Sequence, residues 1–191
     1  QPKFLALKYP QKIDIPMILR TPMGGRRGYG PTHSQSIEKL IVGLPNINVV
    51  VMNHFIDPSI LYNNALESKK FNIIIENKVL YSQYLFQEII EGYEYEVTSL
   101  IRFPIIKIKP KRHKPSCTIF TYGHELTYVE EALKTLLYEH DIFCEVICPT
   151  LITPLEIEPI KDSVIKTKKL LTIEEGPSFA AIGSEVISSL V

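Results

Sequence analysis

One histidine, His33, lies in a glycine-rich segment where a side chain could do acid–base chemistry. The segment 20–35 holds four glycines and two adjacent arginines, which make it a poor core element. A neutral imidazole near its titration point can donate or accept a proton, so His33 is a candidate general acid or base. The alternative is that His33 only caps the helix that follows.

The glycines of this segment could cradle a phosphate through their backbone N–H groups. However, the run is neither Gly-x-Gly-x-x-Gly nor a P-loop, and the next predicted helix begins several residues later. We therefore expect a loop that shapes a channel and a subunit contact. Arg26 and Arg27 can pair with an acidic partner or remain solvated. The residues expected to form the channel are Gly28, Tyr29, Gly30, Thr32, Ser34 and Gln35.

Other reactive side chains lack a comparable setting. Cys144 and Cys148 lie four apart on a predicted strand with His140 nearby, but no fourth zinc ligand has suitable spacing. We therefore expect core thiols and no metal site. The pair Glu174-Glu175 ends a predicted strand and is interpreted as a structural turn. Of the other histidines, His54 and His113 lack motif context, whereas His124 follows a strand end where a role is possible.

The elements around the glycine-rich segment indicate a parallel α/β unit. Apolar runs predict strands at 13–19, 46–53 and 72–76, and a helical pattern covers 36–44. Asp57 as N-cap with Pro58 behind it predicts a helix that ends near residue 69. Strands alternating with helices specify a parallel sheet, whose carboxyl ends carry the chemistry.

The second half of the chain repeats this alternation. We expect strands at 117–122, 142–147 and 170–174, and helices at 126–138, 155–168 and 179–190, with a turn at 175–178. Between the halves, 82–116 is predicted to be an extended, solvated connector with one amphipathic strand near 105–108. Its basic cluster at 107–114 lacks the aromatic residues of a nucleic-acid surface.

Composition limits the function classes. The 191 residues, 45% of them hydrophobic, suit one domain or two small ones with a core. Lysine plus arginine equals aspartate plus glutamate at 21 each, which gives no reason to expect nucleic acid or a membrane as partner. Three cysteines without a Cys-x-x-Cys pair favour reduced thiols in a cytosolic protein.

The run at 20–35, Arg-Thr-Pro-Met-Gly-Gly-Arg-Arg-Gly-Tyr-Gly-Pro-Thr-His-Ser-Gln, resembles a signature of the beta subunits of thiamine-diphosphate-dependent 2-oxo acid dehydrogenases. This transketolase-like group includes the pyruvate, branched-chain 2-oxo acid and acetoin dehydrogenases. Further matches follow in the family's order at 75–81, 118–123, 145–147, 154–155, 174–176 and 183–186. The resemblance therefore spans nearly the whole chain.

The resemblance implies an α/β fold in two parts. Residues 1–81 would be the C-terminal part of a pyrimidine-binding domain with a parallel sheet, 82–116 the connector, and 117–191 a transketolase C-terminal-type domain. That last domain would have three layers and a mostly parallel sheet. The resemblance also puts His33 at the mouth of the active site, where it could protonate a dihydrolipoyl thiolate or hold the intermediate.

The departures from the family concern the cofactor. In relatives, a glutamate upstream of the glycine-rich loop binds the aminopyrimidine ring, and nothing before Arg20 here supplies it. The complete enzyme uses thiamine diphosphate and magnesium, and we expect neither to bind this chain alone. The family's acidic-Asn-Pro turn, associated with a monovalent cation, is replaced at 67–71, and Cys-Pro-Thr at 148–150 favours a divergent relative.

The chain starts without an initiator methionine, so we expect a fragment of such a beta subunit, inert alone. The implied reaction is oxidative decarboxylation of a 2-oxo acid with acyl transfer to lipoamide. Its expected partners are an alpha subunit or upstream alpha-like domain, a second beta chain and a lipoyl acyltransferase, in the cytoplasm or the mitochondrial matrix. Two alternatives stay open: an assembly module for dimerisation and acyltransferase docking, or a transketolase-like enzyme of specialised metabolism without a lipoyl acceptor.

Overall fold

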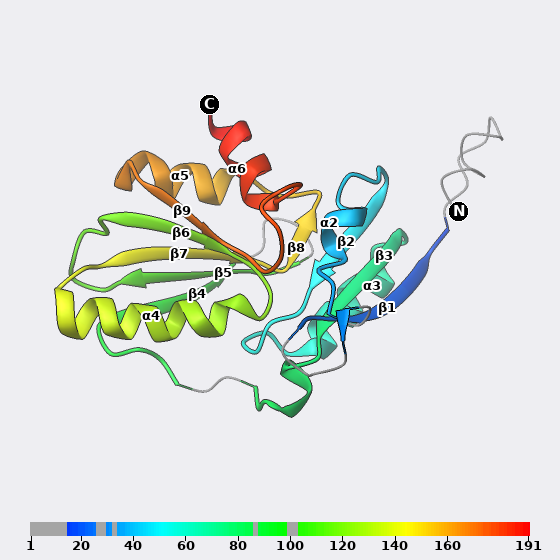
Figure 1. Cartoon of the computed structure of the whole chain (residues 1–191), viewed down its shortest axis with the longest axis horizontal. Coiled ribbons are helices and arrows are strands. Elements are labelled where there is room, and N and C mark those ends of the chain that lie inside the picture. Colours follow the sequence, from blue (N-terminus) through cyan, green and yellow to red (C-terminus); the bar gives the residue numbers. More distant parts are fainter. Residues whose placement is uncertain (1–14, 26–29, 32–33, 86–87, 99–102) are drawn as a thin grey trace.

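The computed structural model describes residues 15–25, 30–31, 34–85, 88–98 and 103–191. These residues form a four-stranded and a five-stranded sheet with helices on their faces (Figure 1). This arrangement confirms the expected α/β fold class with parallel strands at its centre.

The first sheet has the strand order β1 (Met17–Met23), β3 (Phe71–Asn77), β2 (Ile47–Val51) and β8 (Leu151–Thr153). Strands β1, β3 and β2 are parallel, and every residue of β2 is buried. Their continuous apolar runs suit a sheet covered on both faces. The predicted strands at 46–53 and 72–76 are confirmed, whereas β1 begins later than the predicted strand at 13–19.

Two helices belong to this unit. Helix α3 (Pro58–Glu67) starts where predicted, because the Asp57 carboxylate accepts a 2.8 Å hydrogen bond from the Ser59 backbone N–H. Helix α2 (Glu38–Ile41) is a single turn, much shorter than the predicted helix at 36–44. Pro45, after Gly43, helps to end it because residues before a proline avoid the helical region.

The second sheet has the order β4 (Tyr93–Thr98), β5 (Ile105–Pro110), β7 (Cys144–Pro149), β6 (Cys117–Thr121) and β9 (Leu170–Ile173). Strand β6 is parallel to β7 and β9, and β5 adds antiparallel to β7. Helix α4 (Glu125–His140) packs on one face, and α5 (Glu158–Thr167) and α6 (Ile182–Leu190) pack on the other (Figure 1). These are the three expected layers.

The stretch 82–116 differs from the solvated connector that we predicted. It follows the short 3-10 helix η2 (Leu80–Ser82) and contributes both β4 and β5 to the second sheet. Ile106 and Ile108 are fully buried, which confirms the amphipathic strand. The missed strand β4 alternates tyrosine with glutamate, and its Glu94 and Glu96 pair across the sheet with Lys109. The basic cluster thus serves strand pairing in part.

Strand β8 is the second unpredicted strand, and it joins the two halves. It leaves β7 and pairs antiparallel with β2, so α5 starts three residues later than the predicted helix at 155–168. Three residues are too few to show a hydrophobic period, so only the partner strand reveals them. Both core clusters also contain residues of both sheets, including Val50 with Val146 and Val51 with Ile147.

The described helices include none that is both long and apolar enough to cross a membrane.

Candidate functional site

The carboxyl ends of β1, β2 and β3 meet at one edge of the first sheet, where open parallel sheets bind their ligands. Strand β1 runs into the glycine-rich segment, β2 runs into Met52–His54, and β3 ends at Glu76 and Asn77. Successive side chains of a strand point to opposite faces, so Glu76 and Asn77 serve two different clusters.

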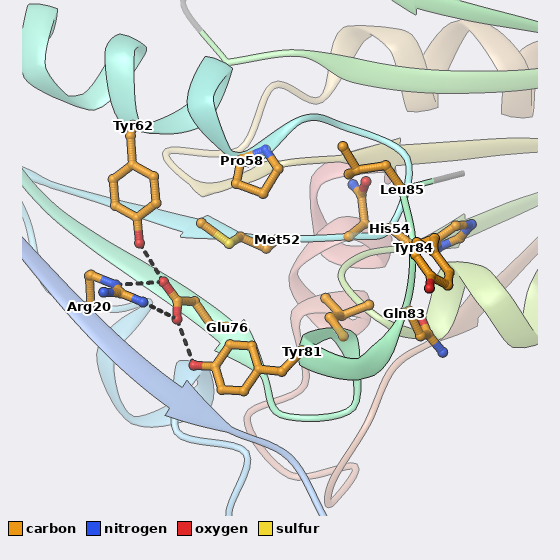
Figure 2. A pocket seen from close by; sticks show the side chains of 12 residues that line it. Arg20, Met52, His54, Pro58, Tyr62, Glu76, Tyr81, Gln83, Tyr84 and Leu85 are labelled. Carbon is orange, nitrogen blue, oxygen red and sulfur yellow. Dashed lines mark hydrogen bonds and ion pairs between the residues drawn. The ribbon is translucent and has the colours of Figure 1, made fainter. Parts of the chain in front are cut away.

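Glu76 lies in a pocket of about 340 Å³ on the face of the sheet that carries α3 (Figure 2). The pocket combines an apolar wall, which includes Met52, with aromatic hydroxyls and one carboxylate. The twelve lining residues come from β1, the end of β2, α3, β3 and the stretch after it: Arg20, Met52, Asn53, His54, Pro58, Tyr62, Glu76, Leu80, Tyr81, Gln83, Tyr84 and Leu85.

The Glu76 carboxylate holds three side chains from three different elements. Arg20 donates to it in bidentate fashion, with Nε 2.8 Å from Oε1 and Nη2 3.0 Å from Oε2. The Tyr62 hydroxyl donates to Oε1, and the Tyr81 hydroxyl donates to Oε2 at 2.6 Å (Figure 2). The Arg20 guanidinium carbon also lies 5.8 Å from the Tyr62 ring centroid, within cation–π range.

This network keeps Glu76 ionised. Burial alone would raise its pKa, but the hydrogen bonds from Arg20, Tyr62 and Tyr81 outweigh it and lower the pKa to about 2. Burial, with the hydrogen bond to Glu76, raises the pKa of Tyr62 and of Tyr81 to about 12. The pocket therefore presents a paired carboxylate and two protonated phenols at neutral pH, not a free general base.

His54, for which the sequence indicated no catalytic role, joins the pocket to the second sheet. Its Nε2 lies 2.8 Å from Glu130 Oε2 on α4, and its Nδ1 lies 3.2 Å from the Thr127 hydroxyl. Glu130 also accepts a 3.1 Å hydrogen bond from Tyr95 on β4. These contacts give His54 a structural role between β2 and α4, and no local pattern could have revealed partners more than seventy residues away.

On the opposite face of the sheet, the start of the glycine-rich segment is fixed by Glu175. The Gly25 backbone N–H donates to Glu175 Oε1 at 3.0 Å, and Asn77 Nδ2 donates to Oε2 at 3.2 Å. Gly24 has φ +97°, and a Cβ there would lie 2.6 Å from the Asn77 amide. A side chain at this position would therefore disrupt the turn.

The end of the segment leads into α2, where a buried polar cluster forms. Lys39 Nζ lies 3.4 Å from Glu174 Oε2 and donates to the Pro177 carbonyl at 2.6 Å. The Tyr122 hydroxyl lies 3.2 Å from Glu38 Oε1 and 3.1 Å from Glu174 Oε2, so its single hydrogen serves one of them at a time. Burial raises the pKa of Glu38 to about 7.

Four of the predicted site residues, Gly28, Tyr29, Thr32 and His33, lie outside the described residues. Gly30, Ser34 and Gln35 are described and exposed, and the Ser34 hydroxyl donates to the Gly30 carbonyl at 2.9 Å. The pocket residues Arg20 and Glu76 were not predicted, although both lie in the motifs at 20–35 and 75–81. A carboxylate at the end of an apolar strand was the available signal.

The cysteines are core residues, as expected. Cys144 and Cys148 are buried in the cluster between the sheet and α4, and burial raises the pKa of the Cys144 thiol to about 11. Within the described ranges, no group of three or more histidine, cysteine, aspartate or glutamate side chains is placed to hold a metal ion.

Residues 106–191 match the family described as Transketolase, C-terminal domain. The structure has the α/β fold of that domain there. A solved structure titled "Split gene transketolase, inactive beta4 tetramer" superposes with a TM-score of 0.64 at 21% identity, and the alignment covers 90% of this chain and 52% of that one. This likeness concerns the fold.

The chain is also similar to curated beta subunits of the pyruvate dehydrogenase E1 component. It is 29% identical to that of Rickettsia bellii over 176 residues, 30% identical to that of Porphyra purpurea over 179, and 28% identical to the mitochondrial one of Bos taurus over 183. These alignments cover 92–93% of this chain and 48–51% of the relatives. The chain thus spans about half the length of the curated relatives that it matches.

Proposed function

We propose that this chain serves as the beta component of a thiamine-diphosphate-dependent 2-oxo acid dehydrogenase that passes its acyl group to lipoamide. The observation that carries the proposal is the continuous similarity of more than nine-tenths of the chain to pyruvate dehydrogenase E1 beta subunits. The strand–loop–helix at the carboxyl edge of the first sheet supports it, because such edges hold ligands in open α/β sheets.

In this proposal, the glycine-rich segment forms one wall of the channel that leads to the reacting centre. Its residues 28–30, 32 and 34–35 line the channel, and His33 donates a proton to the thiolate of the dihydrolipoyl arm. Thiamine diphosphate, when bound in the complete enzyme, supplies the carbanion chemistry of decarboxylation.

The described residues do not form a binding site that suits thiamine diphosphate and magnesium. Glu76, the carboxylate of the pocket, is already bound by Arg20, Tyr62 and Tyr81. Among the described residues, no cluster of carboxylates or histidines is placed to bind the metal ion that accompanies a diphosphate. In this proposal, the alpha subunit or alpha-like domain binds the cofactor, and these 191 residues alone should be inactive.

The test is reconstitution with the alpha subunit of a pyruvate dehydrogenase E1 component. Calorimetry should detect tight binding of thiamine diphosphate with magnesium to the reconstituted complex, and none to the 191-residue chain. The complex should oxidise a 2-oxo acid with an artificial electron acceptor and acylate a lipoyl domain. Tight cofactor binding by the chain alone would contradict the assignment, and a complex that uses only a sugar acceptor would favour the transketolase-like alternative.

A second role, assembly, is favoured by apolar side chains on the surface near the C-terminus. Phe179 is 88% exposed, and Ile187 on α6 and Leu171 on the edge strand β9 are about half exposed. Exposed apolar side chains can serve as contacts with another protein where they lie together. The proposed partners are a second beta chain and a lipoyl acyltransferase, in the cytoplasm or the mitochondrial matrix. A strictly monomeric chain in sedimentation, without affinity for the acyltransferase, would exclude this role.

A further inference from the structure

The pocket beside Glu76 has no part in the proposed function, yet its walls suit a small aromatic ring. Its volume of about 340 Å³ lies at the lower end of the range for small-molecule sites. Three phenol rings, those of Tyr62, Tyr81 and Tyr84, lie around it, and Met52 adds apolar surface (Figure 2). Aromatic and apolar side chains on several sides of a small cavity favour a planar ligand that packs against them.

The charged groups of the pocket are already paired with one another or with their neighbours. Arg20 binds the ionised Glu76 carboxylate through two nitrogens. His54 Nε2 lies against Glu130, and its Nδ1 lies against the Thr127 hydroxyl. An anion in the pocket would lie near the Glu76 carboxylate, and a cation would lie near the Arg20 guanidinium. Either would lose its hydration without reaching an unpaired opposite charge. The pocket therefore suits an uncharged ligand.

Asn53 supplies a hydrogen-bond donor in the wall of this pocket. The residue is only 3% exposed, and its Oδ1 accepts hydrogen bonds from the Phe55 and Ile56 N–H groups, both at 3.0 Å. The oxygen and the nitrogen of a planar amide point apart, so Nδ2 points away from that turn. Nδ2 is buried without a hydrogen-bond partner among the described residues. A buried donor without a partner costs free energy, which the carbonyl oxygen of a ligand would recover.

We propose that the pocket binds an uncharged aromatic molecule with a carbonyl oxygen, such as an aromatic amide, and that Asn53 Nδ2 donates to that oxygen. The ring packs against the tyrosines and Met52. The Tyr62 and Tyr81 hydroxyls give their hydrogens to Glu76, so their oxygens keep lone pairs that can accept from an N–H of the ligand. This binding site is independent of the proposed function, because it uses neither the glycine-rich loop nor the cofactor.

NMR titrations of the full chain with benzamide, benzoate and benzylamine test the choice of an uncharged ligand. The three probes share one ring, and at pH 7 they are neutral, anionic and cationic. Benzamide should shift the side-chain NH₂ signals of Asn53 and bind in the millimolar range. Benzoate and benzylamine should bind about tenfold more weakly or less. Unchanged Asn53 signals with benzamide, or equal or tighter binding of a charged probe, would overturn the proposal.

Two variants test the residues that contact the ligand. Asn53→Asp keeps an acceptor for the turn but loses the donor, so the Kd for benzamide should rise about tenfold. Asn63→Asp, at an exposed position of α3 outside the pocket, is the matched control and should bind like wild type.

Tyr84→Ala removes a ring that is 95% exposed, so the variant should fold, and its Kd for benzamide should rise about fivefold. Tyr138→Ala, at an exposed position of α4, is its control. Wild-type affinity in Tyr84→Ala, or in a folded Asn53→Asp variant, would overturn the proposal.

Discussion

Glu38 and Glu76 are both buried carboxylates, yet their surroundings move their pKa values in opposite directions. Glu76 receives three hydrogen-bond donors, and their effect exceeds that of burial. Glu38 has Tyr122 beside Oε1, whereas its Oε2 is buried without a hydrogen-bond partner among the described residues. Burial dominates at Glu38, whereas the donors, the Arg20 guanidinium first, outweigh burial at Glu76.

Glu38→Gln should therefore make the chain more stable at pH 8 and change it little at pH 5. The pKa of Glu38 rises from 4.5 to about 7 on folding, so its ionisation costs nothing below pH 4.5 and costs most above pH 7. The difference in free energy of unfolding between variant and wild type should grow by up to about 3 kcal/mol between these pH values. Urea unfolding at pH 5, 6, 7 and 8 measures it.

The control for this experiment is Glu139→Gln, at an exposed position of α4, which should show no such pH dependence. A difference between Glu38→Gln and wild type that stays constant from pH 5 to 8 would mean that Glu38 is ionised throughout.

His33→Ala separates acid–base chemistry from a helix cap. In the reconstituted enzyme, acylation of a lipoyl domain should fall by about 10²-fold or more, and decarboxylation with an artificial acceptor should stay within about tenfold of wild type. A helix cap alone would cost about 0.5–2 kcal/mol of stability and spare both half-reactions. Equal losses in both, at an unchanged melting temperature, would instead assign His33 to decarboxylation.

The turn that follows strand β6 contains a glycine, Gly123, where the two sheets approach each other. Gly123 has φ +67°, and a Cβ at this position would lie 2.8 Å from Val51 Cγ1 at the end of β2. The backbone conformation and the contact both exclude a side chain. The Val51 N–H also donates to the Thr150 carbonyl at 2.8 Å, so the ends of β2, β6 and β7 meet at this point.

Gly123→Ala should lower the free energy of unfolding by about 1–3 kcal/mol, because it combines strained backbone with overpacking. Gly43→Ala is the matched control, since nothing lies within 4 Å of the added Cβ and no positive φ is involved. Its stability should stay equal or rise slightly. Thermal unfolding measures the melting temperature of each variant. Equal melting temperatures for the two variants would show that the sheets can move apart at Gly123 without a loss of stability.

The described residues pack as one body, although the two halves of the chain resemble two α/β units. Strand β8 comes from the second half and completes the first sheet, and both core clusters draw residues from both sheets. The 2.8 Å contact between His54 Nε2 and Glu130 Oε2 links them again. Contacts of this extent couple the stability of the halves.

Chemical unfolding should therefore show one transition, with the same midpoint by circular dichroism and by tyrosine fluorescence. The chain has ten tyrosines and no tryptophan, so tyrosine emission reports on both halves. Ile152→Ala, in β8, should lower the midpoint of that single transition by removing a buried side chain shared by the halves. Two separate transitions in the wild-type chain would show that the halves fold independently.

Local patterns in the sequence were sufficient for most of the strands and helices and for the family resemblance. Periodicity and caps act over a few residues, which is why α3 begins at the predicted Asp57–Pro58 boundary and α4 lies where its apolar spacing indicated. The alternation of tyrosine and glutamate in β4 is also typical of a strand. However, its charged residues and the prolines nearby favour a solvent-exposed connector when only the sequence is considered.

Only the tertiary structure decided which polar groups meet. The Glu76 carboxylate pairs with Arg20, which is 56 residues away in the sequence. The Gly25 N–H donates to Glu175, which is 150 residues away. Strand β8 forms because it pairs with β2. Helix α2 is limited to one turn between the glycine-rich segment and the turn at 174–177 that contacts Lys39. These polar groups become neighbours only when the two sheets pack together. The free energy of that packing comes from many contacts between residues far apart in the sequence, which no short stretch of sequence contains.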